Sequence, residues 1–179
     1  YLNEGKILSL ISDAGTPMLS DPGRLLVNHC LKNGIEITPI PGVSSITSAI
    51  SVSGFSDQFL FYGFLPKTEK ELEKILLSVS SYPFTLVFFI TSKKLNFYIK
   101  SFKKFFSGRK IMIAKEITKI YESFIRKSVD ELDIFKDPLK GELTVVISEK
   151  NNKNKTYDEE KIVNKIKKYL KKYSLKDTV

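Results

Sequence analysis

Two loops rich in glycine, proline, serine and aspartate constrain the fold of this chain most, because each follows a short apolar run. The first loop spans residues 12–23 and the second begins at Pro41. The runs before them, residues 8–11 and 35–40, carry few charges and several β-branched residues, which is typical of buried parallel strands. Ligands bind open α/β sheets beside the loops at the carboxyl ends of such strands. We therefore predict a parallel sheet with a ligand site at these two loops.

The first loop carries two aspartates with different expected roles. Asp13 directly follows the first predicted strand, residues 6–12. Its carboxylate can accept hydrogen bonds from a ribose or an ammonium group, but aspartate is also common in turns, so both interpretations stay open. Asp21 precedes Pro22, and an N-cap followed by proline predicts a helix that begins there and ends at residues 33–34.

Beyond the two loops, the apolar periodicity predicts alternating helices and strands. Further helices are expected after Pro41 and over residues 68–80, 95–106, 128–135 and 158–173, and further strands over residues 58–62, 84–90, 110–117, 120–126 and 142–148. Pro66 breaks the chain after a strand, and the composition changes there from serine- and glycine-rich to lysine- and phenylalanine-rich. We predict the remainder of an N-terminal α/β domain in residues 1–64, a C-terminal α/β domain in residues 65–149, and a basic linker with an amphipathic helix in residues 150–179.

Composition and charge restrict the functional classes. The net charge of +9 favours an anionic partner such as RNA, although a lysine-rich composition alone can produce it. One cysteine and one histidine exclude an internal disulfide and disfavour a zinc site, so we expect a cytoplasmic protein without a metal. No apolar run approaches the ~20 residues of a membrane helix, so we expect no membrane partner. Neither a Gly-x-Gly-x-x-Gly nor a Walker-type loop is present, which disfavours dinucleotide dehydrogenases and nucleotide hydrolases.

Five motifs occur in a characteristic order. They are residues 12–23, 41–45, 61–66, 115–122 and 141–144. Together they resemble the ribosomal RNA small-subunit methyltransferase I family, in the tetrapyrrole-methylase-like class of S-adenosylmethionine-dependent methyltransferases. The resemblance implies a two-domain α/β fold of class III methyltransferases, S-adenosylmethionine as cofactor, 2′-O-methylation of a cytidine in small-subunit rRNA, and a homodimer. It also implies a further strand and a glycine-rich loop at the N-terminus, so we expect the N-terminal domain to be incomplete in this chain.

The resemblance further implies a cofactor site between the two domains. The implied contacts are Asp13, Ala14, Gly15, Thr16, Met18, Leu19, Ser44, Ser45, Phe64, Leu143 and Thr144. Small residues let the main chain approach a ligand closely, Asp13 is a plausible ribose acceptor, and Met18 and Leu19 could form an apolar wall. For residues 141–144, a simple turn that enters a strand is the alternative.

A dense polar group on otherwise apolar strands supplies the candidates for catalysis. It contains Lys115, Glu116, Lys119 and Glu122, with Tyr121 between them. A general base would accelerate attack by a ribose hydroxyl about 10²–10⁴-fold, and a glutamate or a lysine with a lowered pKa can fill that role. Cross-strand ion pairs are the structural alternative, but the motif match favours function. The sequence does not select one base among the four.

One departure from the family pattern concerns the substrate. After the predicted strand 84–90 the family carries an acid and a Ser/His/Arg group, whereas this chain has Lys93 and Lys94. The lysines keep the positive charge but lack the planar fork of arginine. This departure leaves the details of substrate contact open. Two other functions also stay open: methylation of a tetrapyrrole or another small molecule, and a non-catalytic RNA- or ribosome-binding module.

Overall fold

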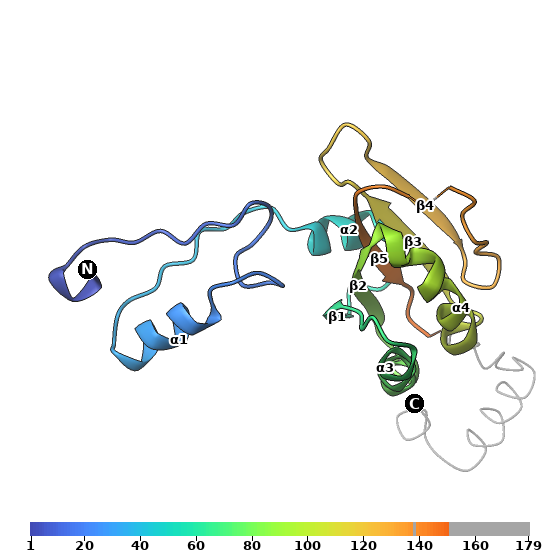
Figure 1. The fold of residues 1–179 in the computed structure, drawn as a ribbon, viewed down its shortest axis with the longest axis horizontal. Coiled ribbons are helices and arrows are strands. Elements are labelled where there is room, and N and C mark those ends of the chain that lie inside the picture. Colours follow the sequence, from blue (N-terminus) through green and yellow to red (C-terminus); the bar gives the residue numbers. More distant parts are fainter. Residues whose placement is uncertain (138, 151–179) are drawn as a thin grey trace, which may run out of the picture.

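A five-stranded mixed sheet forms the body of the protein in the computed structural model, which describes residues 1–137 and 139–150. The strands are β1 (Phe59–Phe64), β2 (Thr85–Thr91), β3 (Lys110–Lys115), β4 (Ser123–Ser128) and β5 (Glu142–Ile147). Their order in the sheet is β1-β2-β5-β3-β4 (Figure 1). β1 and β2 are parallel, and the other three neighbouring pairs are antiparallel. The predicted α/β class is confirmed, and the predicted tail helix lies outside the described residues.

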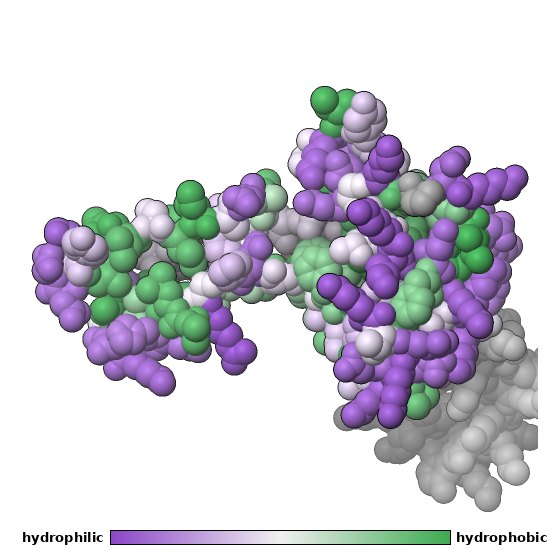
Figure 2. Space-filling model, viewed as in Figure 1, coloured by the Kyte–Doolittle hydropathy of each residue, from purple (hydrophilic) through white to green (hydrophobic). Residues whose placement is uncertain are grey.

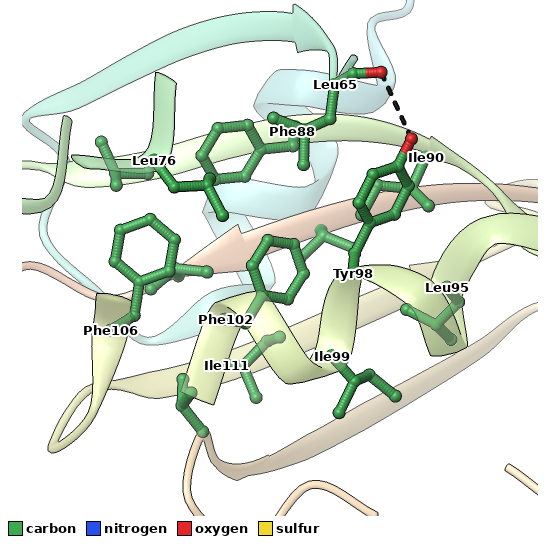
Figure 3. Packing of buried hydrophobic residues seen from close by; sticks show 14 of the residues in the cluster. Leu65, Leu76, Phe88, Ile90, Leu95, Tyr98, Ile99, Phe102, Phe106 and Ile111 are labelled. Atoms are coloured by element: carbon green, nitrogen blue, oxygen red, sulfur yellow. Dashed lines mark hydrogen bonds between the residues drawn. The ribbon is translucent and has the colours of Figure 1, made fainter. Parts of the chain in front are cut away.

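Helices cover both faces of the sheet. α3 (Glu69–Ser80) and α4 (Leu95–Phe106) pack on one face and enclose the larger core cluster, while α2 (Ser45–Ser53) packs on the other (Figure 1). α4 has the predicted bounds, because its apolar residues repeat with the helical period. Phe102 and Phe106 point from α4 toward Phe88 of β2, and the Tyr98 hydroxyl donates to the Leu65 carbonyl at 3.3 Å (Figure 3).

A buried arginine joins the ends of several elements at one side of this core. The Arg109 side chain is 3% exposed, and its guanidinium donates to the main-chain carbonyls of Ser80, Tyr82 and Ser148. Burial lowers the pKa of Arg109, and nearby Glu149 opposes that shift. The charged guanidinium therefore supplies hydrogen bonds to three main-chain carbonyls at the ends of these elements.

Residues 1–43 form an arm that extends away from the sheet (Figure 1). It holds a short 3-10 helix, Leu2–Glu4, and α1 (Arg24–Lys32). The predicted strands at 6–12 and 35–40 are wrong: both segments are extended but join no ladder, and Ile7 and Ile40 are 94% and 86% exposed. A strand requires a hydrogen-bonded neighbour, and within the described residues neither segment has one.

The start of α1 also differs from the prediction. The N-cap is Gly23 rather than Asp21, and the helix begins two residues after Pro22. Gly23 has a φ of 133°, and a Cβ there would lie 2.7 Å from a methyl group of Leu10. The chain therefore turns into the helix at a position that only glycine fits. In contrast, α2 follows Pro41 as predicted, with Ser44 as its N-cap and Gly54 as its C-cap.

Two further elements differ from the sequence-based expectation. β3 ends at Lys115 and β4 begins at Ser123, so their connection is residues 116–122 rather than two residues. The predicted helix 128–135 is a turn, because main-chain bonds direct it to the start of β3: the Val129 amide donates to the Arg109 carbonyl at 2.9 Å. The domain boundary at residues 64/65 stays a prediction; β1, just before it, belongs to the same sheet as β2.

Candidate cofactor and substrate site

One end of the sheet gathers the predicted residues of the C-terminal domain. β1, β2 and β3 end there, and β4 and β5 begin there. In the ladder, Thr91 at the end of β2 faces Glu142, and Lys115 at the end of β3 faces both Leu143 and Ser123. Phe64 ends β1 opposite Phe89. The predicted cofactor residues of this domain and the predicted catalytic group therefore share one end of the sheet.

Leu143 and Thr144 are neighbours in sequence but lie on opposite faces of β5. Leu143 is 2% exposed and belongs to the core cluster beneath α3 and α4. Thr144 faces α2 and is paired with Phe89 on one side and Ala114 on the other. Only the side chain of Thr144 can line a site on the α2 side, while Leu143 can contribute main-chain atoms alone.

Aromatic side chains stand beside Thr144 on this face. The ring centroids of Phe64 and Phe89 are 5.5 Å apart, and those of Phe61 and Phe89 are 4.9 Å apart. Phe64 is 56% exposed, so part of this aromatic surface faces solvent. The arrangement suits a planar apolar ring such as adenine. Phe64 belongs to the predicted site residues. Phe89 does not, because its place beside Thr144 depends on the pairing of β2 with β5.

The loop of residues 12–23 and the loop that begins at Pro41 contact one another. Such a contact is necessary if both loops contribute to one site. The Thr16 hydroxyl donates to the Val43 carbonyl at 3.2 Å, immediately before Ser44 and Ser45. Ser20 lies against β1, since its hydroxyl oxygen is 3.5 Å from the Cβ position of Gly63. The first loop, the start of α2 and the end of β1 are therefore adjacent.

Within the first loop, the predicted cofactor residues differ in their exposure to solvent and in their contacts. Asp13, Ala14 and Gly15 are exposed, and the Asp13 carboxylate has no hydrogen-bond partner among the described residues. Gly15 has a φ of 73° and nothing within 4 Å of its Cβ position. Met18 packs on its own loop beside Gly23, while 40% of Met18 and 44% of Leu19 remain exposed. These two side chains form an apolar surface, but no described residue closes it into a wall.

The turn of residues 116–122 is organised by two glutamates. Glu116 Oε1 accepts from the Glu142 amide at 2.8 Å and from Lys119 Nζ at 3.2 Å. Lys119 Nζ also lies 3.1 Å from a carboxylate oxygen of Glu142. Glu122 Oε2 accepts from the Thr118 amide at 2.6 Å. The two carboxylates therefore fix the conformation of the turn. The arrangement requires glycine at position 141, because any Cβ there would collide with the Glu116 carboxylate.

These hydrogen bonds shift the pKa values of Glu116 and Lys119 away from the range that suits a general base. The amide of Glu142, and then Lys119, lower the pKa of the Glu116 carboxyl. Hydrogen bonds to Glu142 and Glu116 raise the pKa of Lys119. A general base acts best with a pKa near the working pH. The observed contacts of Glu116 and Lys119 thus stabilise the turn. Their role in catalysis stays a prediction.

Lys115 is the member of this group that the turn leaves available. Its ammonium lies 5.7 Å from the centre of the Tyr121 ring and donates to the Tyr121 carbonyl at 3.4 Å. It makes no salt bridge within the part of the chain that the structure describes.

Among the described residues there is no cluster of three or more metal-ligating side chains, and no helix is long and apolar enough to cross a membrane.

Comparison with known proteins identifies the family. Residues 1–133 match the family model of the tetrapyrrole (corrin/porphyrin) methylases. A curated Thermotoga maritima relative, ribosomal RNA small subunit methyltransferase I, is 41% identical over 153 residues, which cover 83% of this chain and 68% of the relative. The chain spans 54% to 68% of the length of the first four curated relatives, all of the same name.

Solved structures show the same fold at low sequence identity. The methyltransferase CobJ has a TM-score of 0.57 at 16% identity, covering 75% of this chain and 62% of that one. Uroporphyrin-III C-methyl transferase from Thermus thermophilus, complexed with S-adenyl homocysteine, has a TM-score of 0.53 at 16% identity and the same coverage. The chain belongs to the tetrapyrrole methylase family and, within it, to the ribosomal RNA small subunit methyltransferases I.

Proposed function

We propose that the protein transfers a methyl group from S-adenosylmethionine to the ribose 2′-hydroxyl of a cytidine in small-subunit rRNA. The observation that carries the proposal is the contact between the arm and the sheet. Ser20 of the arm lies against Gly63 of β1, and within the arm Thr16 bonds to Val43 just before α2, so the loop with Asp13 adjoins the strand end with Phe64. The relatives' names support methylation of rRNA, and the choice of cytidine and of the 2′-hydroxyl rests on the resemblance.

The residues at this place match the chemistry of the cofactor. The exposed Asp13 carboxylate can accept hydrogen bonds from ribose hydroxyls, and Phe64 with Phe89 offers an apolar surface to the adenine. Ser44 and Ser45, at the start of α2, and Thr144 supply hydroxyls beside it. When bound, S-adenosylmethionine supplies an electrophilic methyl group on a sulfonium.

The chain's own residues would then bind and align the RNA. Lys93 and Lys94 follow β2, and Lys115 ends β3, so three ammonium groups border the sheet end at which the cofactor residues lie. Such groups attract phosphates. Holding the ribose hydroxyl in line with the methyl group supplies a large part of the rate, since alignment removes an entropic barrier.

We also propose that the protein acts in the cytoplasm as a homodimer. The supporting observation is the row of exposed apolar side chains along the arm, which includes Ile7, Ile11 and Ile40. Extended apolar surface on a folded protein normally marks a contact with another surface. Sedimentation of the purified protein over a range of concentrations tests this assembly.

The decisive experiment compares two aspartates of the same loop. Asp13→Asn should weaken S-adenosylmethionine binding by roughly 10- to 100-fold in calorimetry, the usual effect of losing a hydrogen bond to a charged group. Asp21→Asn is the matched control, because Asp21 is also exposed and does not cap α1. Equal affinities for both variants would contradict the assigned site.

The substrate is tested by activity on RNA. The protein should methylate small-subunit rRNA, with binding that weakens steeply as salt rises. Methylation of a tetrapyrrole with little salt dependence would establish the small-molecule alternative. Binding of RNA without binding of the cofactor would leave the non-catalytic RNA-binding module as the function.

A further inference from the structure

Two large apolar side chains lie at the tip of the turn between β3 and β4. Ile120 is 93% exposed and Tyr121 is 73% exposed. The hairpin of β3 and β4 projects beyond the rest of the sheet (Figure 1), and Figure 2 shows a small hydrophobic group at its tip beside more hydrophilic atoms. Neither side chain belongs to either core cluster, so the described chain itself gives them no packing role.

The turn of residues 116–122, which carries these two side chains, has a strained main-chain conformation. Glu116 and Thr118 have φ values of 51° and 69°, which non-glycine residues rarely adopt. Main-chain bonds from Lys119 to Glu116 at 2.9 Å and from Glu122 to Lys119 at 3.1 Å fix the turn, in addition to the two carboxylates. Strained main-chain conformations cluster at functional sites, so a strained turn that presents two exposed side chains is a candidate contact surface.

The surroundings of Tyr121 indicate the chemistry of the partner. The Lys115 ammonium lies over the ring, yet most of the ring surface stays accessible. This end of the sheet carries five lysines and three glutamates: Lys93, Lys94, Lys115, Lys119, Lys140, Glu116, Glu122 and Glu142. An aromatic ring next to a cation on a net positive surface suits an unpaired nucleotide, whose base stacks and whose phosphate pairs with the cation.

A second copy of the chain fits this surface less well. The lysines outnumber the glutamates at this end of the sheet, so two copies that met there would repel one another. We propose that Tyr121 stacks on an unpaired base of the rRNA next to the ribose that is methylated, with Ile120 packing against the same nucleotide and Lys115 facing its phosphate. This assignment rests on the proposed function.

The test measures binding of a single-stranded rRNA fragment that contains the target cytidine. Tyr121→Ala should weaken binding roughly 5- to 150-fold, the range for loss of one stacked base, whereas Tyr121→Phe should bind like the wild type. Tyr1→Ala is the matched control, because Tyr1 is 76% exposed and also has a lysine over its ring, but at the remote end of the arm. The salt dependence should not change in Tyr121→Ala, since no phosphate contact is lost.

Each other outcome overturns the inference. If the wild type methylates rRNA and Tyr121→Ala binds equally well, the stacking role fails while the proposed function stands. If Tyr121→Ala changes the sedimentation of the free protein and loses RNA only as a consequence, the tip is an interface between copies. If the wild type neither binds nor methylates rRNA, both proposals fail together.

Discussion

Gly141 provides a direct test of how the turn of residues 116–122 is built. Its φ is 96°, and a Cβ would lie well under 3.0 Å from the carboxylate of Glu116. Gly141→Ala should therefore act twice. The positive φ costs roughly 1–2 kcal/mol by itself, and the new methyl group displaces the carboxylate from the Glu142 amide and from Lys119.

A second glycine separates the two effects. Gly108 has a φ of 79° and nothing within 4 Å of its Cβ position, so Gly108→Ala should cost only the conformational strain. For a protein of this size, roughly 1–2 kcal/mol corresponds to a fall in Tm of about 2–8 °C. In guanidinium unfolding followed by circular dichroism, Gly141→Ala should be clearly less stable than Gly108→Ala.

A double-mutant cycle completes the test of this contact. In the Glu116→Ala background the collision is gone, so Gly141→Ala should then cost about as much as Gly108→Ala does. If Gly141→Ala costs the same in both backgrounds, the contact with Glu116 does not stabilise the turn, and the explanation given for the glycine is refuted.

Two other predictions concern buried and ionised groups. Arg109→Lys should destabilise the protein by about 2–4 kcal/mol in urea unfolding, because an ammonium cannot reach all three main-chain carbonyls that the guanidinium serves. The second concerns pH. The folded-state pKa of Glu116 is lowered, so its carboxylate stabilises the fold above the unfolded-state pKa, and this stabilisation is lost as the pH falls through the folded-state pKa. The stability difference between wild type and Glu116→Gln should therefore be full at neutral pH and disappear in acid.

Elements that bury a periodic apolar face could be predicted from the sequence, whereas those that depend on a distant partner could not. α4 begins and ends as predicted because its repeat makes one face of the helix apolar whatever surrounds it. Residues 6–12 and 35–40 have the composition of buried strands, but composition does not supply a neighbouring strand. β3 was predicted too long because Ile117 continues its apolar alternation, although the positive φ of Glu116 already ends the ladder.

The same limit applies to the site. The two loops at which the sequence places the site are local features that follow apolar runs, and they do contact one another, while their role in binding stays a prediction. The contact of Ser20 with Gly63 and the bond of Glu116 to the Glu142 amide join positions far apart in the sequence, and only the folded chain shows them. Without that bond, Glu116 resembles a free carboxylate and a candidate base. With it, the same carboxylate is a hydrogen-bond acceptor that closes a turn.

The motif at residues 141–144 shows why a family pattern mixes structural and binding roles. Along β5 successive side chains alternate between the two faces of the sheet, so Leu143 enters the core beneath α3 and α4 while Thr144 faces α2. Gly141, two residues before Leu143, makes room for the Glu116 carboxylate. Three positions of one motif thus contribute separately to the core, to the proposed cofactor site and to the turn of residues 116–122. Because Gly141 precedes β5 and Leu143 and Thr144 lie at its start, the proposed cofactor site and the turn that presents Tyr121 are both attached to the beginning of the same strand.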